Sequence, residues 1–153
     1  MSPGSREKLS DCQFCEISRG DSDEIEMIAS TDRWIAFFPL EPAALGHTLV
    51  IPTRHVENFL LADDSTTREM AIAVRVVGDA ISRALGPSGM NLITSAGEAA
   101  EQTVFHLHFH LLPRWAGDHF GPIWPRGDQA GRGSRLTAEK IRRELSQHQL
   151  VWR

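Results

Sequence analysis

Residues 104–112 read Val104-Phe-His106-Leu-His108-Phe-His110-Leu-Leu112, with three histidines at alternate positions and apolar residues between them. Side chains alternate between the two faces of a β-strand, so a strand here places His106, His108 and His110 on one face and the apolar residues on the other. Core packing alone does not explain three ionisable side chains in such a row. Clusters of ionisable groups mark functional sites instead. The stretch therefore predicts a strand with one chemical face and one core face.

Two kinds of chemistry suit the histidine face. Three imidazoles can hold a catalytic zinc ion that keeps one open coordination position. A largely neutral imidazole can instead attack an electrophile with its free ring nitrogen, while a second imidazole handles a proton. The residues of this stretch alone leave both alternatives open.

Breaker residues divide the rest of the chain into short elements. Apart from the histidine strand, we expect strands over residues 24–30, 34–38, 47–52 and 90–94. A long helix is expected from the N-capping oxygens near Asp63 to about Leu85, because apolar residues recur there at three- and four-residue steps and Gly86-Pro87 follows. A short helix is expected over about 137–148. This order predicts an α+β fold with a mainly antiparallel sheet and helices on one face.

Composition narrows the class of protein. The chain has 153 residues, 41% hydrophobic and 24% charged, which suits one globular domain. Its formal net charge of −4 argues against nucleic acid as the main partner. No apolar run is long enough to span a membrane, and residues 1–10 lack the apolar stretch of a signal peptide. We therefore expect a cytoplasmic protein with a flexible tail over residues 1–10.

A Cys-x-x-Cys pair, Cys12 and Cys15, stands near the N-terminus. A structural disulfide is disfavoured in the cytoplasm. Half of a zinc site, a redox pair and two reduced, partly buried cysteines remain open as alternatives.

The chain resembles the histidine-triad (HIT) superfamily, in particular its bacterial branch. Residues 106–112 follow the His-φ-His-φ-His-φ-φ signature of that superfamily. Further pieces agree with it in order and spacing: Cys12-Gln-Phe-Cys15-Glu-Ile17, Ala36-Phe37, Pro42, Gly46-His47-Thr-Leu-Val-Ile-Pro52, His55, Gln102-Thr-Val-Phe-His106, Pro113-Arg-Trp-Ala-Gly-Asp118 and Trp124-Pro125. The resemblance implies a HIT domain over residues 11–125, followed by an irregular tail with a short helix over 126–153. It also implies a five-stranded sheet with a long helix and a short helix, joined to a second sheet across a homodimer.

The resemblance implies that His108 attacks the α-phosphorus of a nucleotide substrate, which decides against the catalytic tri-histidine zinc site. His110 then donates a proton or hydrogen bond toward the leaving group. His47 supports the same centre, although it could instead be a strand-end residue without a chemical role. Gln102 and Thr103 match positions that contact the phosphate. Ser95, which we also expect at the substrate, stands where the family often has an asparagine.

Two further sets of residues follow from the resemblance. By position, Phe14, Ile17 and Leu40 line an apolar base pocket, or are plain core residues. Cys12, Cys15, His55 and His106 match the ligands of zinc-bearing members. On this reading zinc is structural, and His106 takes no direct part in acid–base chemistry.

The chain departs from the family pattern at the sugar and the phosphate. Pro39 stands where an acidic residue usually holds the ribose hydroxyls, and the carboxylate of Glu41 lies two residues on. Glu101 replaces a glycine before Gln102 and adds a negative charge there. We therefore expect a nucleotide hydrolase or nucleotidyl transferase. Because of these departures, two alternatives stay open: a dinucleoside polyphosphate hydrolase, and a nucleotide-binding module with residual activity.

Overall fold

The computed structural model describes residues 12–123 and 135–147. The tail expected over residues 1–10 lies outside the described residues, as do 126–134 and 148–153 of the expected C-terminal tail. The chain divides into two compact units, residues 1–119 and residues 120–153.

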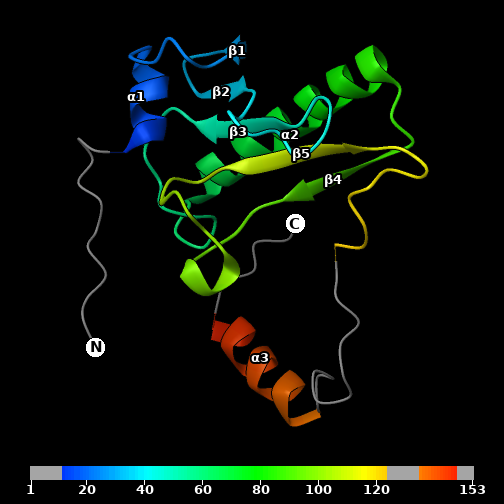
Figure 1. The fold of residues 1–153 in the computed structure, drawn as a ribbon. Coiled ribbons are helices and arrows are strands. Elements are labelled where there is room, and N and C mark those ends of the chain that lie inside the picture. Colours follow the sequence, from blue (N-terminus) through cyan, green and yellow to red (C-terminus); the bar gives the residue numbers. More distant parts are fainter. Residues whose placement is uncertain (1–11, 124–134, 148–153) are drawn as a thin grey trace. The chain divides into compact units, whose positions relative to one another are not determined.

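The first unit is built around one five-stranded sheet (Figure 1). Its strands are β1 (Met27–Ser30), β2 (Trp34–Phe37), β3 (Thr48–Pro52), β4 (Gly89–Ile93) and β5 (Phe109–Arg114). They lie in the order β1-β2-β3-β5-β4, and each pair of neighbours is antiparallel. The α+β fold class expected from the sequence is confirmed.

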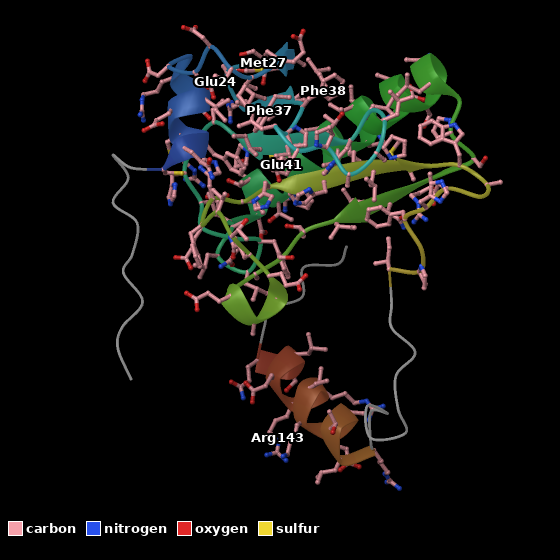
Figure 2. All side chains as sticks on the ribbon, viewed as in Figure 1. Glu24, Met27, Phe37, Phe38, Glu41 and Arg143 are labelled. Atoms are coloured by element: carbon pink, nitrogen blue, oxygen red, sulfur yellow. The ribbon has the colours of Figure 1, made fainter. Side chains whose placement is uncertain are left out.

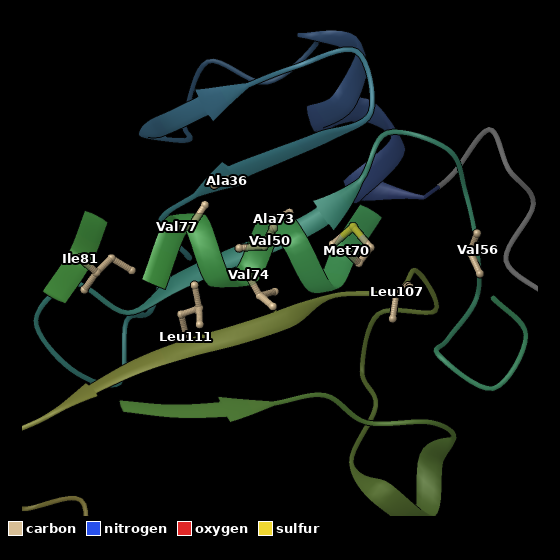
Figure 3. Close-up of a cluster of buried hydrophobic side chains, with 10 residues drawn as sticks. All are labelled: Ala36, Val50, Val56, Met70, Ala73, Val74, Val77, Ile81, Leu107 and Leu111. Atoms are coloured by element: carbon tan, nitrogen blue, oxygen red, sulfur yellow. The ribbon is translucent and has the colours of Figure 1, made fainter. Parts of the chain in front are cut away.

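The long helix α2 (Asp64–Leu85) follows its sequence pattern closely. It begins where the Asp63 carboxylate accepts a 2.8 Å hydrogen bond from the Thr66 N–H, and it ends at Gly86 in the left-handed conformation. Its apolar stripe packs on one face of the sheet (Figure 3). The buried residues of this core are Ala36, Val50, Val56, Met70, Ala73, Val74, Val77, Ile81, Leu107 and Leu111.

A second helix, α1 (Gln13–Arg19), was not expected, and it corrects the prediction that helices cover one face only. Successive residues of β2 and β3 contribute to two different cores: Ala36 and Val50 belong to the α2 core, whereas Ile35, Phe37, Leu49 and Ile51 pack with α1 residues. Both faces of these strands are therefore buried. Helix α1 has only seven residues, too few for a helical repeat to stand out in the sequence.

The histidine strand begins later than expected. Strand β5 starts at Phe109, so His106 and His108 precede the ladder instead of lying within it. The alternation of faces nevertheless holds, because Leu107 and Leu111 are in the α2 core. The strand also continues two residues beyond Leu112, through Pro113 to Arg114. A proline lacks only the donor N–H, so a strand can include it at that position.

Two further elements complete the described residues. A single 3₁₀ turn, η2 (Glu98–Ala100), lies in the loop between β4 and β5. In the second unit, α3 (Arg135–Gln147) takes the place of the helix expected over about 137–148, and its apolar residues Leu136, Ile141 and Leu145 are exposed. No helix in 12–123 or 135–147 is both long and apolar enough to cross a bilayer.

Candidate active site

Four side chains that are far apart in sequence meet beside the first turn of α1. The Cys12 Sγ lies 3.5 Å from the His106 Nδ1, and the Cys15 Sγ lies 3.4 Å from the His55 Nδ1 and 3.5 Å from the His106 Nδ1. The four donor atoms of Cys12, Cys15, His55 and His106 all lie within 4.8 Å of one another. The four residues expected from the sequence as metal ligands are thus brought together.

The geometry of this group fits zinc. Sulfur and nitrogen ligands of a tetrahedral zinc ion, bound at their usual lengths, stand about 3.6 Å apart. The His106 Nε2–H donates a 2.9 Å hydrogen bond to the Pro52 carbonyl, which leaves the Nδ1 lone pair facing both sulfurs. Such a carbonyl commonly orients a metal-binding imidazole. Two thiols and two imidazoles with this spacing can supply the four ligands of a tetrahedral zinc ion.

The middle histidine, His108, is buried next to this group. Its Nδ1–H donates a 2.7 Å hydrogen bond to the His106 carbonyl oxygen. A neutral imidazole carries one ring proton, so this bond assigns the proton to Nδ1 and the lone pair to Nε2. Burial lowers the pKa of His108 and so favours the neutral ring. In the neutral ring the Nε2 lone pair of His108 is therefore not engaged by this hydrogen bond.

His47 and His110 form a pair whose protons are also assigned by hydrogen bonds. The Ala43 N–H donates to the His47 Nδ1 at 3.0 Å, so the proton of neutral His47 is on Nε2. That Nε2–H then donates to the His110 Nδ1 at 2.9 Å, which assigns the proton of His110 to its own Nε2. The rings of His110 and His108 are neighbours, with centroids 5.0 Å apart. His110 therefore has its N–H donor on Nε2, in a ring next to that of His108.

Burial keeps the members of this cluster uncharged. Burial is the main cause that lowers the pKa of His110 to about 4, and the nearby His108 and His47 lower it further. Burial also lowers the pKa of His47. At neutral pH these imidazoles therefore act through hydrogen bonds and lone pairs and carry little charge.

The residues expected to form a base pocket separate into two groups. Phe14 and Ile17 are buried in the α1 core, and the Phe14 ring contacts His108 edge-on with ring centroids 5.3 Å apart. Leu40 is 68% exposed and does not belong to that core. The structure therefore brings Phe14 to His108, but it does not place Leu40 among the same buried residues.

The expected phosphate contacts also differ from one another. Gln102 is buried, and its side-chain amide hydrogen-bonds the backbone at Gly97, Glu57 and Val104. Thr103 is exposed and Ser95 is partly exposed. The two residues that are open to solvent can reach a ligand without rearrangement, whereas the amide of Gln102 is already engaged.

The departures from the family pattern lie in loops. Pro39 is partly exposed and Glu41 is exposed, both in the connection between β2 and β3, where Figure 2 labels Glu41. Glu101, also exposed, has a positive φ of 62°, a backbone conformation that favours glycine. The glycine usual at this position in the family would adopt it without strain.

Sequence reasoning missed two contributors to the site. The Thr94 hydroxyl donates a 2.8 Å hydrogen bond to the His108 carbonyl, and the Ala43 N–H orients His47. Thr94 directly follows β4, whose Ile93 pairs with His110, so a correct strand pairing would have placed it opposite Phe109, next to the His108 carbonyl. Ala43 contributes only a backbone group, which leaves no signal in the side-chain pattern.

Comparison with known protein families matches the HIT domain to residues 22–117. The chain belongs to the HIT family. Among its relatives, a HIT protein of Bacillus subtilis is 37% identical over 74% of this chain and 78% of its own. An adenosine 5'-monophosphoramidase of Schizosaccharomyces pombe is 32% identical over 74% of this chain and 83% of its own. An adenylylsulfatase of Arabidopsis thaliana is 31% identical over 90% of this chain and 65% of its own.

Solved structures agree with this assignment. A HIT family protein of Bacillus anthracis superposes with a TM-score of 0.78 at 29% identity and covers 90% of this chain and 96% of its own. A zinc-bound histidine triad protein of Mycobacterium smegmatis has a TM-score of 0.69 at 29% identity, covering 91% and 99%. A HIT family hydrolase of Clostridium thermocellum has a TM-score of 0.64 at 35% identity, covering 75% and 97%. Like its relatives of known activity, the chain is an enzyme, a hydrolase.

Proposed function

We propose that the chain cleaves a nucleoside 5′-phosphate derivative through a covalent intermediate on Nε2 of His108. The observation that carries this proposal is the 2.7 Å hydrogen bond from the His108 Nδ1–H to the His106 carbonyl. That bond leaves the Nε2 lone pair available, and burial favours the neutral ring that a nucleophile requires.

The reaction has two displacement steps at the α-phosphorus. In the first, the Nε2 lone pair of His108 forms a P–N bond, and the leaving group departs with the electron pair of its bond to phosphorus. The Nε2–H of His110 donates a hydrogen bond to the departing atom, which stabilises the charge that develops there. In the second, a water oxygen forms a P–O bond, the P–N electrons return to His108, and the water proton passes to solvent. An acceptor other than water makes the same step a nucleotidyl transfer.

Two relatives suggest the substrate class. The names adenosine 5'-monophosphoramidase and adenylylsulfatase both describe an adenosine 5'-phosphoryl group with a small leaving group. We therefore propose such esters, anhydrides or amidates as substrates of this chain. The alternative enzymatic function is that of a dinucleoside polyphosphate hydrolase, and the alternative non-enzymatic function is that of a binding module with residual activity.

We further propose that Cys12, Cys15, His55 and His106 hold a structural zinc ion. The 3.4–3.5 Å sulfur–nitrogen distances support this assignment. The zinc-bound HIT structure from Mycobacterium smegmatis supports it independently. When bound, zinc ties the start of α1 to the triad segment and takes no part in the displacement. Metal analysis of protein purified without chelator should find about one zinc per chain.

We also propose a homodimer in which two sheets join at their edges. Strand β4 is the better candidate edge, because it carries the 53% exposed Leu92, and the other edge strand, β1, has a register irregularity between Met27 and Ala29. Irregular edges resist pairing with a second chain, whereas regular apolar ones favour it.

Replacement of the nucleophile tests the mechanism. The His108→Asn variant should keep the fold and lose several orders of magnitude in turnover of an adenosine phosphoramidate, because the covalent step is deleted. The intermediate can be trapped by quenching turnover of the native protein with substrate labelled at phosphorus. The quench should be basic, because a P–N bond is acid-labile. The label should then be found on the peptide that contains His108.

Diadenosine tetraphosphate, assayed in parallel, separates the alternatives. Faster turnover of this compound would favour the dinucleoside polyphosphate hydrolase, and binding of both compounds without turnover would favour a binding module. Near-normal turnover by His108→Asn would rule out the covalent step and require direct attack by water.

A further inference from the structure

Residues 102–108 reach the active site without the support of a strand ladder. Strand β5 begins at Phe109, so the hydrogen bonds of the sheet do not hold the backbone that carries His106 and His108. The proton assignment of His108 nevertheless depends on the position of one atom in this segment, the carbonyl oxygen of His106, which accepts from the His108 Nδ1–H at 2.7 Å. Some other contact must fix that backbone.

The side chain of Gln102 provides such a contact. Its Oε1 accepts a 2.8 Å hydrogen bond from the Gly97 N–H, and its Nε2 donates to the Glu57 carbonyl at 2.7 Å and to the Val104 carbonyl at 3.1 Å. Gln102 is only 3% exposed, so these bonds form away from solvent. One amide therefore joins the loop before it, the segment after it, and the loop that follows β3.

The loop that follows β3 also carries the metal ligand His55. It is tied to the triad segment a second time, because the Leu107 N–H donates to the Val56 carbonyl next to Glu57. Gln102 thus holds together two stretches of chain, one with His55 and one with His106 and His108. The three polar groups of its amide are all used in this way, and a buried amide that left them unpaired would lose stability.

We propose that Gln102 is a positioning residue that acts through the backbone of residues 104–107 on the tautomer and placement of His108, and that it does not bind the substrate phosphate. The proposal rests on the assignment of His108 as the nucleophile, and it replaces the phosphate contact that the sequence suggested for Gln102. Both amide protons are committed to the carbonyls of Glu57 and Val104 before any substrate is present.

Two substitutions test the proposal. Gln102→Glu keeps an oxygen for the Gly97 N–H but turns a carboxylate toward two carbonyl oxygens, and Gln102→Met keeps the length of the side chain without any hydrogen bond. Imidazole ¹⁵N spectra of the zinc-loaded, substrate-free protein should show a smaller population of the Nδ1–H tautomer of His108 in both variants. Since a small displacement of a reacting group is costly, kcat should fall about a hundredfold, with little change in KM.

The neighbouring exposed residue gives the matched control. Thr103→Val removes a hydroxyl that is open to solvent, and it should leave the substrate-free ¹⁵N spectrum of His108 unchanged. If Gln102 instead donated to the phosphate, Gln102→Glu and Gln102→Met would both show the native spectrum without substrate, and the loss would appear in KM. That result overturns the proposal.

The spectra also separate this proposal from the proposed function. They are recorded without turnover, so a changed tautomer in the Gln102 variants would support the positioning role even if His108→Asn proved active. A variant that failed to fold would be recognised by thermal unfolding, and the second substitution then decides the outcome.

Discussion

Four imidazoles of the site, those of His47, His106, His108 and His110, each have their proton placed by one hydrogen bond, and three of these bonds involve backbone atoms. The carbonyls of His106 and Pro52 assign the protons of His108 and His106, and the Ala43 N–H assigns that of His47. His110 takes its assignment from His47. The tautomers of these histidines therefore depend on where the backbone is placed as well as on which residues are histidine.

The lowered pKa of His110 predicts how activity and stability depend on pH. Burial lowers this pKa to about 4 in the folded protein, whereas an imidazole in the unfolded chain titrates near 6.5. The unfolded state therefore binds more protons between these values, and the free energy of unfolding should decrease as pH falls from about 6.5 toward 4. Because His110 stays neutral in the folded enzyme, turnover should change little between pH 7 and about 5.

A comparison with His110→Asn isolates this contribution. Denaturant unfolding of both proteins at several pH values measures how steeply the free energy of unfolding decreases with acid. The variant lacks one of the buried imidazoles, so its decrease should be shallower than that of the native protein. Equal slopes would mean that His110 is protonated to the same extent in the folded and unfolded states.

At the scale of the element, the turn before β3 places His47. Gly46 has a positive φ of 73°, and a Cβ on it would lie 2.3 Å from the Leu85 Cδ1. Gly86 also has a positive φ, 60°, but nothing lies within 4 Å of a Cβ there. Both Gly46→Ala and Gly86→Ala should therefore destabilise the protein through backbone strain, by about 1–2 kcal/mol each.

The two variants should differ in what else they change. Gly46→Ala must also displace the Leu85 side chain, and its strain falls in the turn directly before His47, so it should be the less stable of the two and lose activity. Gly86→Ala should stay active. Adding Leu85→Ala to Gly46→Ala should remove the steric part of the difference in unfolding free energy. Equal stability and activity of the two single variants would contradict this account.

The elements that the sequence predicted well are those with a long pattern. Helix α2 repeats its apolar positions over 22 residues, and both of its ends carry capping residues, so its bounds were predicted to within about one residue. Helix α1 is only seven residues long, and it was missed. The sequence predicted that the histidine strand starts at Val104, whereas β5 starts at Phe109. Alternation shows only which face a residue packs on: Val104 packs in the α1 core and Leu107 in the α2 core, although neither is in a strand.

The same distinction applies to the site. The candidate metal ligands could be predicted because the residue types themselves carry the chemistry, and the structure brings all four together. Leu40 and Gln102 could not be judged in this way, since exposure and hydrogen-bond partners depend on loops. The Thr94 hydroxyl binds the His108 carbonyl and the Ala43 N–H binds the His47 ring, so finding them requires the strand pairing and the loop backbone, respectively.

At the scale of the molecule, the proposed dimer predicts that the two edges of the sheet respond differently to charge. Leu92 on β4 and Ile28 on β1 are both exposed apolar residues on edge strands, at 53% and 44%. Leu92→Lys should shift the protein to the monomer in light-scattering measurements at concentrations where the native protein is dimeric. Ile28→Lys should leave it dimeric. The opposite result would assign the interface to β1.

The proposed metal site also has a consequence for the rates of folding and unfolding. Cys12 and His106 are separated by 94 positions in the chain, so bringing them together closes a long loop, which is entropically costly before the sheet has formed. The two ends should therefore meet after the rate-limiting step, and a metal that joins them should slow unfolding without speeding folding. Stopped-flow unfolding with and without chelator should show a faster unfolding arm and an unchanged folding arm once zinc is removed. A slower folding arm would instead mean that the ligands already hold the metal in the transition state, and that α1 docks early.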